Sequence, residues 1–175
     1  VEALGKLRDR SASQPLLSML HDSDPEVRRS VIEVLGVIGD EQTCEALTDA
    51  LKDDIAEVRL AAVMVLDVVR CAGATDRLIS MLADSNPGVR NAAARALSDI
   101  GEPAVQPLIR ALWHDEMLVR GSAAVILGRI GDSRAVPKLI DTLADPEATL
   151  RQSAARALGC IGDVRAKSAL LSRAH

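Results

Sequence analysis

The sequence repeats itself about every 31 residues, and this repeat limits the possible folds more than any other feature. A valine-arginine or leucine-arginine pair recurs five times, ending at Arg28, Arg59, Arg90, Arg120 and Arg151. A leucine stands eight residues before each of these arginines, and another stands seven residues after it. A repeat of this length is typical of arrays in which each unit is one supersecondary element that buries its apolar face against neighbouring units.

Each unit has the pattern of two helices. Apolar residues follow each arginine at helical spacing, Pro25 and Pro87 stand where a second helix would begin, and Gly131 and Gly162 stand where one would end. No segment alternates apolar and polar residues as a strand would. The sequence therefore predicts an all-α fold, a right-handed α-solenoid (superhelix) of about five helix pairs.

We expect these pairs to form a single domain over residues 1–175. The expected units are at about 13–39, 42–70, 73–101, 103–131 and 134–162, with half-units at about 1–9 and 165–175. A terminal unit of such an array usually carries a polar outer face, and neither half-unit has one. We therefore expect the chain to be a fragment of a longer array.

Composition supports helix packing and excludes several classes of function. Trp113 is the single aromatic residue, so the core must be built from aliphatic side chains, which suits helices better than sheets. The formal net charge of −4 argues against a protein whose main task is to bind nucleic acid. No apolar run reaches about 18 residues, so we expect no membrane span.

The three cysteines, Cys44, Cys71 and Cys160, are odd in number and share no short spacing. We expect three free thiols, as in a reducing compartment, and hence a cytoplasmic location. A disulfide or a metal site is the alternative.

Several runs carry a resemblance to a known family. They are Asp-Pro-Glu-Val-Arg at 24–28, Leu-Gly-Val-Ile-Gly-Asp at 35–40, Val-Arg-Gly-Ser-Ala-Ala at 119–124 and Leu-Arg-Gln-Ser-Ala-Ala at 150–155. The sequence resembles a HEAT repeat array and is most similar to the short bacterial HEAT-like repeats first associated with phycobilisome lyase subunits. The resemblance covers nearly the whole chain, and it implies a fold more than a function, because this class of repeat has many tasks.

The recurrent arginines have a short polar residue six positions before them. The resemblance implies that these residues form a ladder of Asp–Arg hydrogen bonds along the stacked units, and a guanidinium fork matches a carboxylate well. We interpret these residues as structural: Asp22, Arg28, Asp53, Arg59, Asp84, Arg90, Arg120, Asp145 and Arg151. In the fourth unit His114 replaces the aspartate, beside Trp113.

His114 and Trp113 have two interpretations. They form a local binding spot or a pH-sensitive joint, or they are drift in one unit, with Asp115 taking over the role of the aspartate. A pH-sensitive joint predicts that His114→Asp changes stability mainly below about pH 7.

In arrays of this family the second helices line the concave face, and residues at i, i+4 and i+8 share one side of a helix. Leu60, Met64 and Val68 are apolar where the other units mostly place polar residues. Either they form an apolar binding groove with a charged rim, or the second helix of that unit is simply more deeply covered, by a bent stack or by parts of the protein outside this sequence. The candidate partner-binding residues are Arg29, Glu33, Val37, Leu60, Met64, Val68, Arg95, Val125, Arg129 and Arg156.

Motifs of catalysis are absent from the sequence. There is no nucleophile motif and no glycine-rich phosphate loop, and His21, His114 and His175 are far apart. We expect no catalytic residue, no cofactor and no metal, and a non-catalytic scaffold that binds another protein or a peptide on its concave face. Two alternatives stay open. The resemblance implies a bilin or chromophore lyase-like subunit, and a row of Arg95, Arg129 and Arg156 fits a nucleic-acid-binding module.

Overall fold

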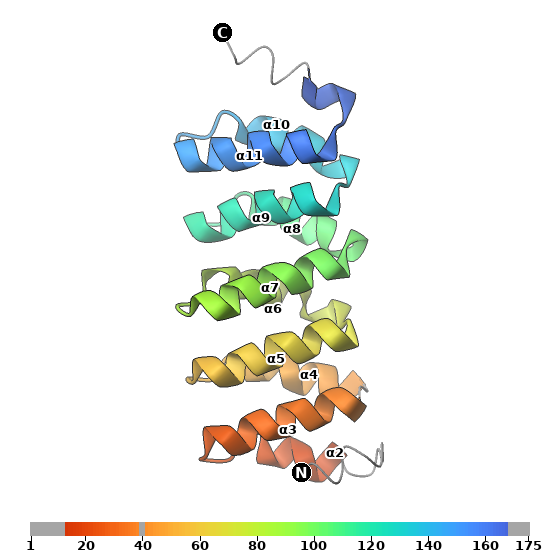
Figure 1. Ribbon diagram of the computed structural model, residues 1–175, viewed down its shortest axis with the longest axis vertical. Helices are drawn as coiled ribbons and strands as arrows, with labels where there is room; N and C mark the ends of the chain where they lie inside the picture. The colour runs from red at the N-terminus through yellow and green to blue at the C-terminus, as the bar shows by residue number, and fades with distance from the viewer. Residues whose placement is uncertain (1–12, 39–40, 168–175) are drawn as a thin grey trace. The chain divides into compact units, whose positions relative to one another are not determined.

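The computed structural model describes residues 13–38 and 41–167, and all regular structure in these residues is helical. Shorter first helices alternate with second helices that are each 14 residues long (Figure 1). The first helices are α2 (Ser13–Met19), α4 (Glu41–Ala50), α6 (Thr75–Ser80), α8 (Val105–Ala111) and α10 (Val136–Thr142). The second helices are α3 (Pro25–Ile38), α5 (Ala56–Val69), α7 (Pro87–Ile100), α9 (Met117–Ile130) and α11 (Ala148–Ile161).

Four short 3₁₀ helices join or extend the first helices. They are η2 (Ala72–Ala74), η3 (Met81–Ala83), η4 (Glu102–Ala104) and η5 (Ser133–Ala135). The predicted all-α solenoid of repeated helix pairs is therefore confirmed. The expected half-unit at 1–9 lies outside the described residues, as does most of the half-unit at 165–175; residues 164–167 are helical.

The chain divides into two compact parts, residues 1–96 and 97–175, called here the N-terminal part and the C-terminal part. In the N-terminal part, α3 packs beside α5, and fully buried side chains such as Leu35, Leu47 and Leu66 form the core. Gly36 allows the approach of these helices, since a Cβ there would lie 2.5 Å from a methyl carbon of Val65. The core is aliphatic, as the composition predicts.

In the C-terminal part, α9 packs beside α11, and their backbones approach closely. A Cβ added at Gly128 would lie 2.7 Å from Cα of Ala157 and 2.9 Å from its Cβ, so only glycine fits there without movement. Gly131 and Gly162 end these helices in the left-handed region, with φ of 77° and 69°. Arg70 occupies the same conformation after α5, with φ of 52°.

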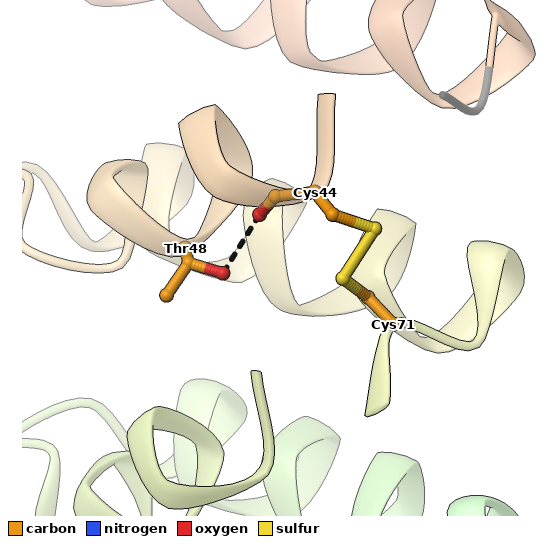
Figure 2. The surroundings of a disulfide bond; sticks show 3 residues. All are labelled: Cys44, Thr48 and Cys71. Carbon is orange, nitrogen blue, oxygen red and sulfur yellow. Dashed lines mark hydrogen bonds between the residues drawn. A yellow bond between two sulfur atoms is a disulfide. The ribbon is translucent and has the colours of Figure 1, made fainter. Parts of the chain in front are cut away.

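A disulfide joins Cys44 and Cys71, whose Cα atoms are 6.0 Å apart (Figure 2). Cys44 lies near the start of α4 and Cys71 directly follows the left-handed residue that ends α5, so the bond ties the two ends of one helix pair together. The expectation of three free thiols is therefore wrong, because only Cys160 is free among the described cysteines. The cytoplasmic location loses the support that it drew from free thiols.

Candidate functional site

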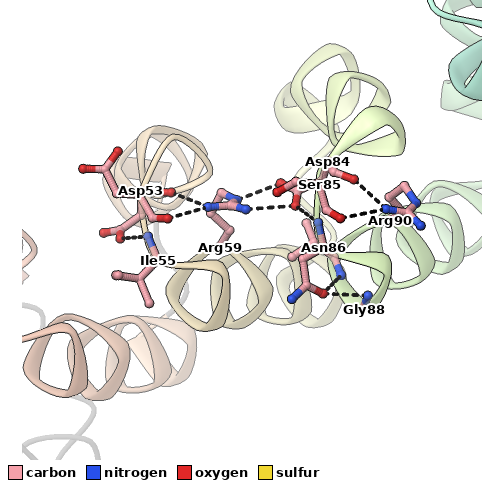
Figure 3. A network of polar contacts seen from close by, with 10 residues as sticks. Asp53, Ile55, Arg59, Asp84, Ser85, Asn86, Gly88 and Arg90 are labelled. Atoms are coloured by element: carbon pink, nitrogen blue, oxygen red, sulfur yellow. Dashed lines mark hydrogen bonds and ion pairs between the residues drawn. The ribbon is translucent and has the colours of Figure 1, made fainter.

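In the N-terminal part, the ladder arginines connect successive units. Arg59 donates from Nε and Nη2 to the two carboxylate oxygens of Asp84, at 2.7 and 2.9 Å, and from Nη1 to the carbonyl oxygen of Asp53 at 2.7 Å (Figure 3). Arg28 makes the same pattern one unit earlier, with the Asp53 carboxylate and the Asp22 carbonyl. Each guanidinium thus holds the turn of its own unit and the carboxylate of the next unit.

The aspartates of these pairs also shape their own turns. Oδ1 of Asp84 accepts a hydrogen bond from the backbone N–H of Asn86 at 2.8 Å, and Oδ1 of Asp53 accepts one from Ile55 at 2.9 Å (Figure 3). Only 12% of the Arg59 side chain and 5% of the Asp84 side chain are exposed. The hydrogen bond from Arg59 lowers the pKa of Asp84 and outweighs the opposing effect of burial.

The pKa of Asp53 is also lowered, but the contributions to it differ. Burial is the largest influence and raises the pKa of this carboxyl, but the hydrogen bonds from Arg28 and Ile55 and the charges of nearby arginines together lower it. Both aspartates are therefore ionised partners in the folded chain at neutral pH. Arg90 donates to the carbonyl oxygens of Asp84 and Ser85, which places it on the same row.

In the C-terminal part, the ladder residues lie in equivalent turns but do not form the bidentate pair. Arg120 donates to the carbonyl oxygens of His114 and Asp115, and its buried Nε has no hydrogen-bond partner among the described residues. Asp145 lies 25 residues after Arg120, as Asp84 does after Arg59, yet its Oδ1 accepts only from the N–H of Glu147. Arg151 likewise donates to carbonyl oxygens, those of Asp145 and Pro146.

His114 takes over the turn role of the missing aspartate. Its Nδ1 accepts a hydrogen bond from the N–H of Glu116 at 3.1 Å, in the place where Asp53 and Asp84 use a carboxylate oxygen. An imidazole with a neutral Nδ1 can accept this bond and an imidazolium cannot. The side-chain acceptor in this turn is therefore His114 itself, and not Asp115, to which the drift interpretation gives that role.

The candidate partner-binding residues of the N-terminal part include an exposed apolar group on neighbouring second helices. Val37 is 49% exposed, Met64 47% and Val68 78%, while Leu60 is half-buried. Met64 and Val68 are therefore not covered by other described parts of this chain. We call Val37, Met64 and Val68 the second-helix patch.

Two sets of ion pairs flank the second-helix patch. Arg29 pairs with Glu26 at 2.6 Å and with Glu33 at 3.8 Å, and Arg95 pairs with Asp67 at 3.2 Å. The predicted charged residues around the patch are therefore present, but their charges are already matched within the chain. A partner would gain more from the apolar side chains than from the charges.

The C-terminal part holds the other three candidates. Val125 is 43% exposed, and Arg129 and Arg156 are exposed on α9 and α11. Neither arginine forms an ion pair with a described residue. Arg95, the third member of the predicted arginine row, is occupied by Asp67 in the N-terminal part.

A pocket that the sequence did not indicate lies between α2 and α4. Its volume is about 540 Å³, and its lining combines apolar side chains such as Leu17 and Ile32 with charged ones. Lys52 pairs with Asp49 at 2.8 Å, and Asp53 is held by Arg28. The pocket therefore combines apolar side chains with charges that are paired within the chain, and with Glu45, which forms no ion pair with a described residue.

Metal and membrane sites are not found in the part of the chain that the structure covers. No group of three or more His, Cys, Asp or Glu side chains is arranged to hold a metal ion among residues 13–38 and 41–167. Within the same ranges no helix has the length and apolar character needed to cross a bilayer.

A model of HEAT repeats matches residues 1–67, 53–125 and 114–175, which together cover the whole chain. The chain belongs to the HEAT repeat family. No curated protein sequence matches it. Many solved structures match the chain, and three of them show how varied the matching proteins are.

The first is the complex of CpcE and CpcF of phycocyanin lyase from Nostoc sp. PCC7120. It is 25% identical, with a TM-score of 0.53 and coverage of 95% of this chain and 71% of that one. The second belongs to a structure of microtubule plus end tracking by XMAP215, CLIP-170 and EB1. It is 18% identical, with a TM-score of 0.76 and coverage of 91% and 83%. The third is a designed armadillo repeat protein, YIII(Dq)4CqI, at 20% identity, a TM-score of 0.51 and coverage of 91% and 86%. The resemblance to phycobilisome-lyase-type HEAT repeats is thus confirmed, and the latter two similarities concern the fold alone.

Proposed function

We propose that this HEAT repeat chain is a non-catalytic scaffold that binds another protein or a peptide through the second-helix patch. The observation that carries the proposal is the exposure of Val37, Met64 and Val68 on α3 and α5. Stacked repeats present extended surfaces that are suited to such partners.

The repeat itself supports this proposal by comparison between units. The positions equivalent to Val37 and Val68 hold Asp99, Arg129 and Cys160 in the other three units. The fold therefore does not require an apolar side chain there. An exposed apolar group that folding does not need is a candidate contact surface.

The chemistry of the patch favours a partner with aliphatic side chains. Methionine adapts its shape to different partners, and valine offers a rigid apolar surface. Each fully buried side chain of this size contributes about 1.5–3 kcal/mol, so half-exposed side chains contribute a part of that. The internally matched ion pairs beside the patch would set orientation more than affinity.

The test compares three chains as bait for partners from a lysate of the source cells, with the captured proteins identified by mass spectrometry. They are the intact chain, the double variant Met64→Glu/Val68→Glu, and the control Val164→Glu, which charges an 83% exposed valine in the C-terminal part. We expect the intact chain and the control to retain a partner that the double variant loses. Identical partner sets for all three chains, with equal helicity by circular dichroism, would refute the proposal.

The similarity to the CpcE–CpcF complex favours one alternative, a chromophore lyase-type subunit. Cys160, which is free and exposed, is then the cysteine available to such chemistry. Incubation with a bilin tests this alternative, because a new visible absorbance that elutes with the chain and is lost in Cys160→Ser would support it. Nucleic-acid binding is tested by titration at low salt, where the exposed Arg129 and Arg156 would act most strongly.

A further inference from the structure

The turn between α8 and α9 exposes apolar side chains in the C-terminal part. Trp113 is 55% exposed, Met117 47% and Leu118 52%, and together we call them the turn patch. Trp113 is the only aromatic residue of the chain and lies on its surface. Tryptophan is among the residues that most often anchor protein partners, and methionine is enriched at interfaces.

The other four units show that the fold does not need these side chains. The position of Leu118 holds only charged or small residues elsewhere, and the positions of Trp113 and Met117 hold no large apolar residue elsewhere. The equivalents are His21, Lys52, Ala83 and Ala144 for Trp113; Pro25, Ala56, Pro87 and Ala148 for Met117; and Glu26, Glu57, Gly88 and Thr149 for Leu118. Three apolar departures in one exposed turn indicate a contact surface.

The basic side chains around the turn patch already interact within the chain. Lys138 Nζ lies 5.2 Å from the centroid of the Trp113 ring and pairs with Asp141 at 3.2 Å. Arg120 is engaged by two carbonyl oxygens of the turn, and Arg110 has an interaction of its own.

Asp115 and Glu116 are exposed in the same turn, and neither forms an ion pair with a described residue. Their side chains are exposed carboxylates beside the turn patch, whereas the guanidinium of Arg120 is partly buried and donates to the turn. A partner that approaches Trp113 and Leu118 is therefore attracted when it carries lysine or arginine next to its apolar anchors.

The size of the turn patch limits the partner. Three half-exposed side chains of these types present on the order of 300 Å² of surface, which is the range of a functional patch on a single chain. A stable pair of folded proteins buries about 800 Å² on each side. The turn patch is therefore too small for a stable dimer of this chain and suits two or three anchor residues of a short segment.

We infer that the turn patch binds a short basic segment of a partner protein, with aliphatic anchors against Trp113, Met117 and Leu118 and cationic side chains beside Asp115 and Glu116. This site is independent of the second-helix patch. Each site can therefore be present without the other.

The single tryptophan makes the site directly measurable, because all tryptophan fluorescence of the chain comes from Trp113. The probe is an amphipathic peptide of about 12 residues made of lysine and leucine at helical spacing. Its analogue with glutamate in place of lysine is the matched control. We expect the basic peptide to give a saturable blue shift that weakens with added salt, and the acidic analogue to give none.

The decisive variant is Met117→Ala/Leu118→Glu, which copies Ala56 and Glu57 of the second unit and keeps Trp113 as the reporter. We expect this variant to bind the basic peptide at least about tenfold more weakly, while Val164→Glu binds it as the intact chain does. Asp115→Asn/Glu116→Gln is expected to weaken binding and to reduce its dependence on salt.

Three results would overturn the inference. The first is equal binding of the basic peptide by the intact chain and the Met117→Ala/Leu118→Glu variant. The second is no binding, or equal binding of the two peptides, by fluorescence and by calorimetry. The third is a dimer in analytical ultracentrifugation that this double variant abolishes, because the occupant of the turn patch would then be a second copy of the chain.

Discussion

Removal of the Asp84 carboxylate is predicted to be the most costly single change among the ladder aspartates. Asp84 accepts two hydrogen bonds from Arg59 and one from the N–H of Asn86, and its side chain is only 5% exposed. In Asp84→Ala, the Arg59 guanidinium stays in a largely buried place and keeps only the carbonyl oxygens of Asp53 and Asp54 as partners.

The expected magnitude follows from these contacts. Leaving one member of a buried ion pair without its partner costs about 3–5 kcal/mol, and the pair of Arg59 and Asp84 is at the lower end because 12% of the arginine is exposed. The lost bond to Asn86 adds about 1 kcal/mol. We therefore expect Asp84→Ala to reduce the free energy of unfolding by about 3–4 kcal/mol.

The repeat supplies a matched control in Asp145→Ala. Asp145 has the same place in its unit, and its Oδ1 likewise accepts a hydrogen bond from the N–H of the residue two positions on, Glu147, but its carboxylate pairs with no arginine among the described residues. Its loss is expected to cost about 1 kcal/mol, the usual value of a turn or cap hydrogen bond. The difference between the two variants, about 2–3 kcal/mol, measures the pairing with Arg59.

Thermal unfolding followed by circular dichroism at pH 7 tests the prediction. For a chain of this length about 1 kcal/mol corresponds to roughly 2–4 °C, so Asp84→Ala should lower Tm by roughly 6–16 °C and Asp145→Ala by roughly 2–4 °C. An Asp84→Ala chain that is no less stable than Asp145→Ala would refute the reasoning. So would an Arg59→Met/Asp84→Ala double variant whose loss equals the sum of the single losses, because paired residues do not behave additively.

The stability difference between the intact chain and Asp84→Ala should also depend on pH. Folding lowers the pKa of Asp84, so its stabilising effect is complete above the unfolded pKa of about 3.9 and is lost as the pH falls through the lower folded pKa. The gap between the intact chain and Asp84→Ala should therefore be constant from about pH 5 to 7 and should narrow below about pH 4. A stability difference that widens in acid would contradict the lowered pKa of Asp84.

Two further predictions concern backbone approach and the disulfide. Gly128→Ala should destabilise the chain by about 1–3 kcal/mol, because its Cβ would meet the backbone of Ala157, whereas Gly159→Ala, which faces open space in a helix, should stabilise it by about 0.5–1 kcal/mol; denaturant unfolding checks both signs. Equal changes in the free energy of unfolding, with the same sign for both variants, would contradict the close approach of α9 and α11. The bond between Cys44 and Cys71 closes a loop whose ends are 27 residues apart, so reduction should remove about 3.5 kcal/mol of stability. Thiol titration of the denatured chain should give one thiol before reduction and three after it, and three thiols beforehand would show that the bond is absent.

The sequence was sufficient for the helices because their local signals agree with the repeat. Pro25 and Pro87 begin α3 and α7, where a missing N–H does no harm, and Gly131 and Gly162 end α9 and α11 in the left-handed conformation. The end of α5 shows the limit of such signals. Arg70 adopts that conformation without being glycine, so no residue type marks the stop there.

Contacts between units were harder to predict, since they depend on distances across the stack. The sequence separation of Arg120 and Asp145 is the same as that of Arg59 and Asp84, yet only the second pair forms. Residue spacing decides which side chains are candidates, and the offset of two packed turns decides whether they meet. The disulfide is a similar case, because antiparallel helices bring the start of α4 to the end of α5 although their cysteines are 27 residues apart.

The candidate surfaces were predicted where one unit departs from the others, but the sequence left open whether each departure marks a binding surface. Met64 and Val68 stood out in the sequence because several of their equivalents are polar, and both are exposed in the structure. For Trp113 the sequence left a binding spot and drift as alternatives, and the structure adds that its exposure is similar to that of Met64. Burial, which the sequence does not give, was the missing quantity.

The units of a repeat array share one fold but differ in sequence. A comparison of equivalent positions therefore shows which residues the fold needs and which it does not. At core positions every unit holds aliphatic residues, so an aliphatic residue there needs no further explanation. At the positions equivalent to Trp113 and Leu118, the other four units fold with histidine, lysine, alanine, glutamate, glycine or threonine, so the fold gains nothing from Trp113 or Leu118. The core is complete without aromatic rings, and Trp113 lies on the surface. Exposure of its apolar ring to water is unfavourable, and burial of the ring by a partner would be favourable. Folding therefore does not explain the position of Trp113, and binding would.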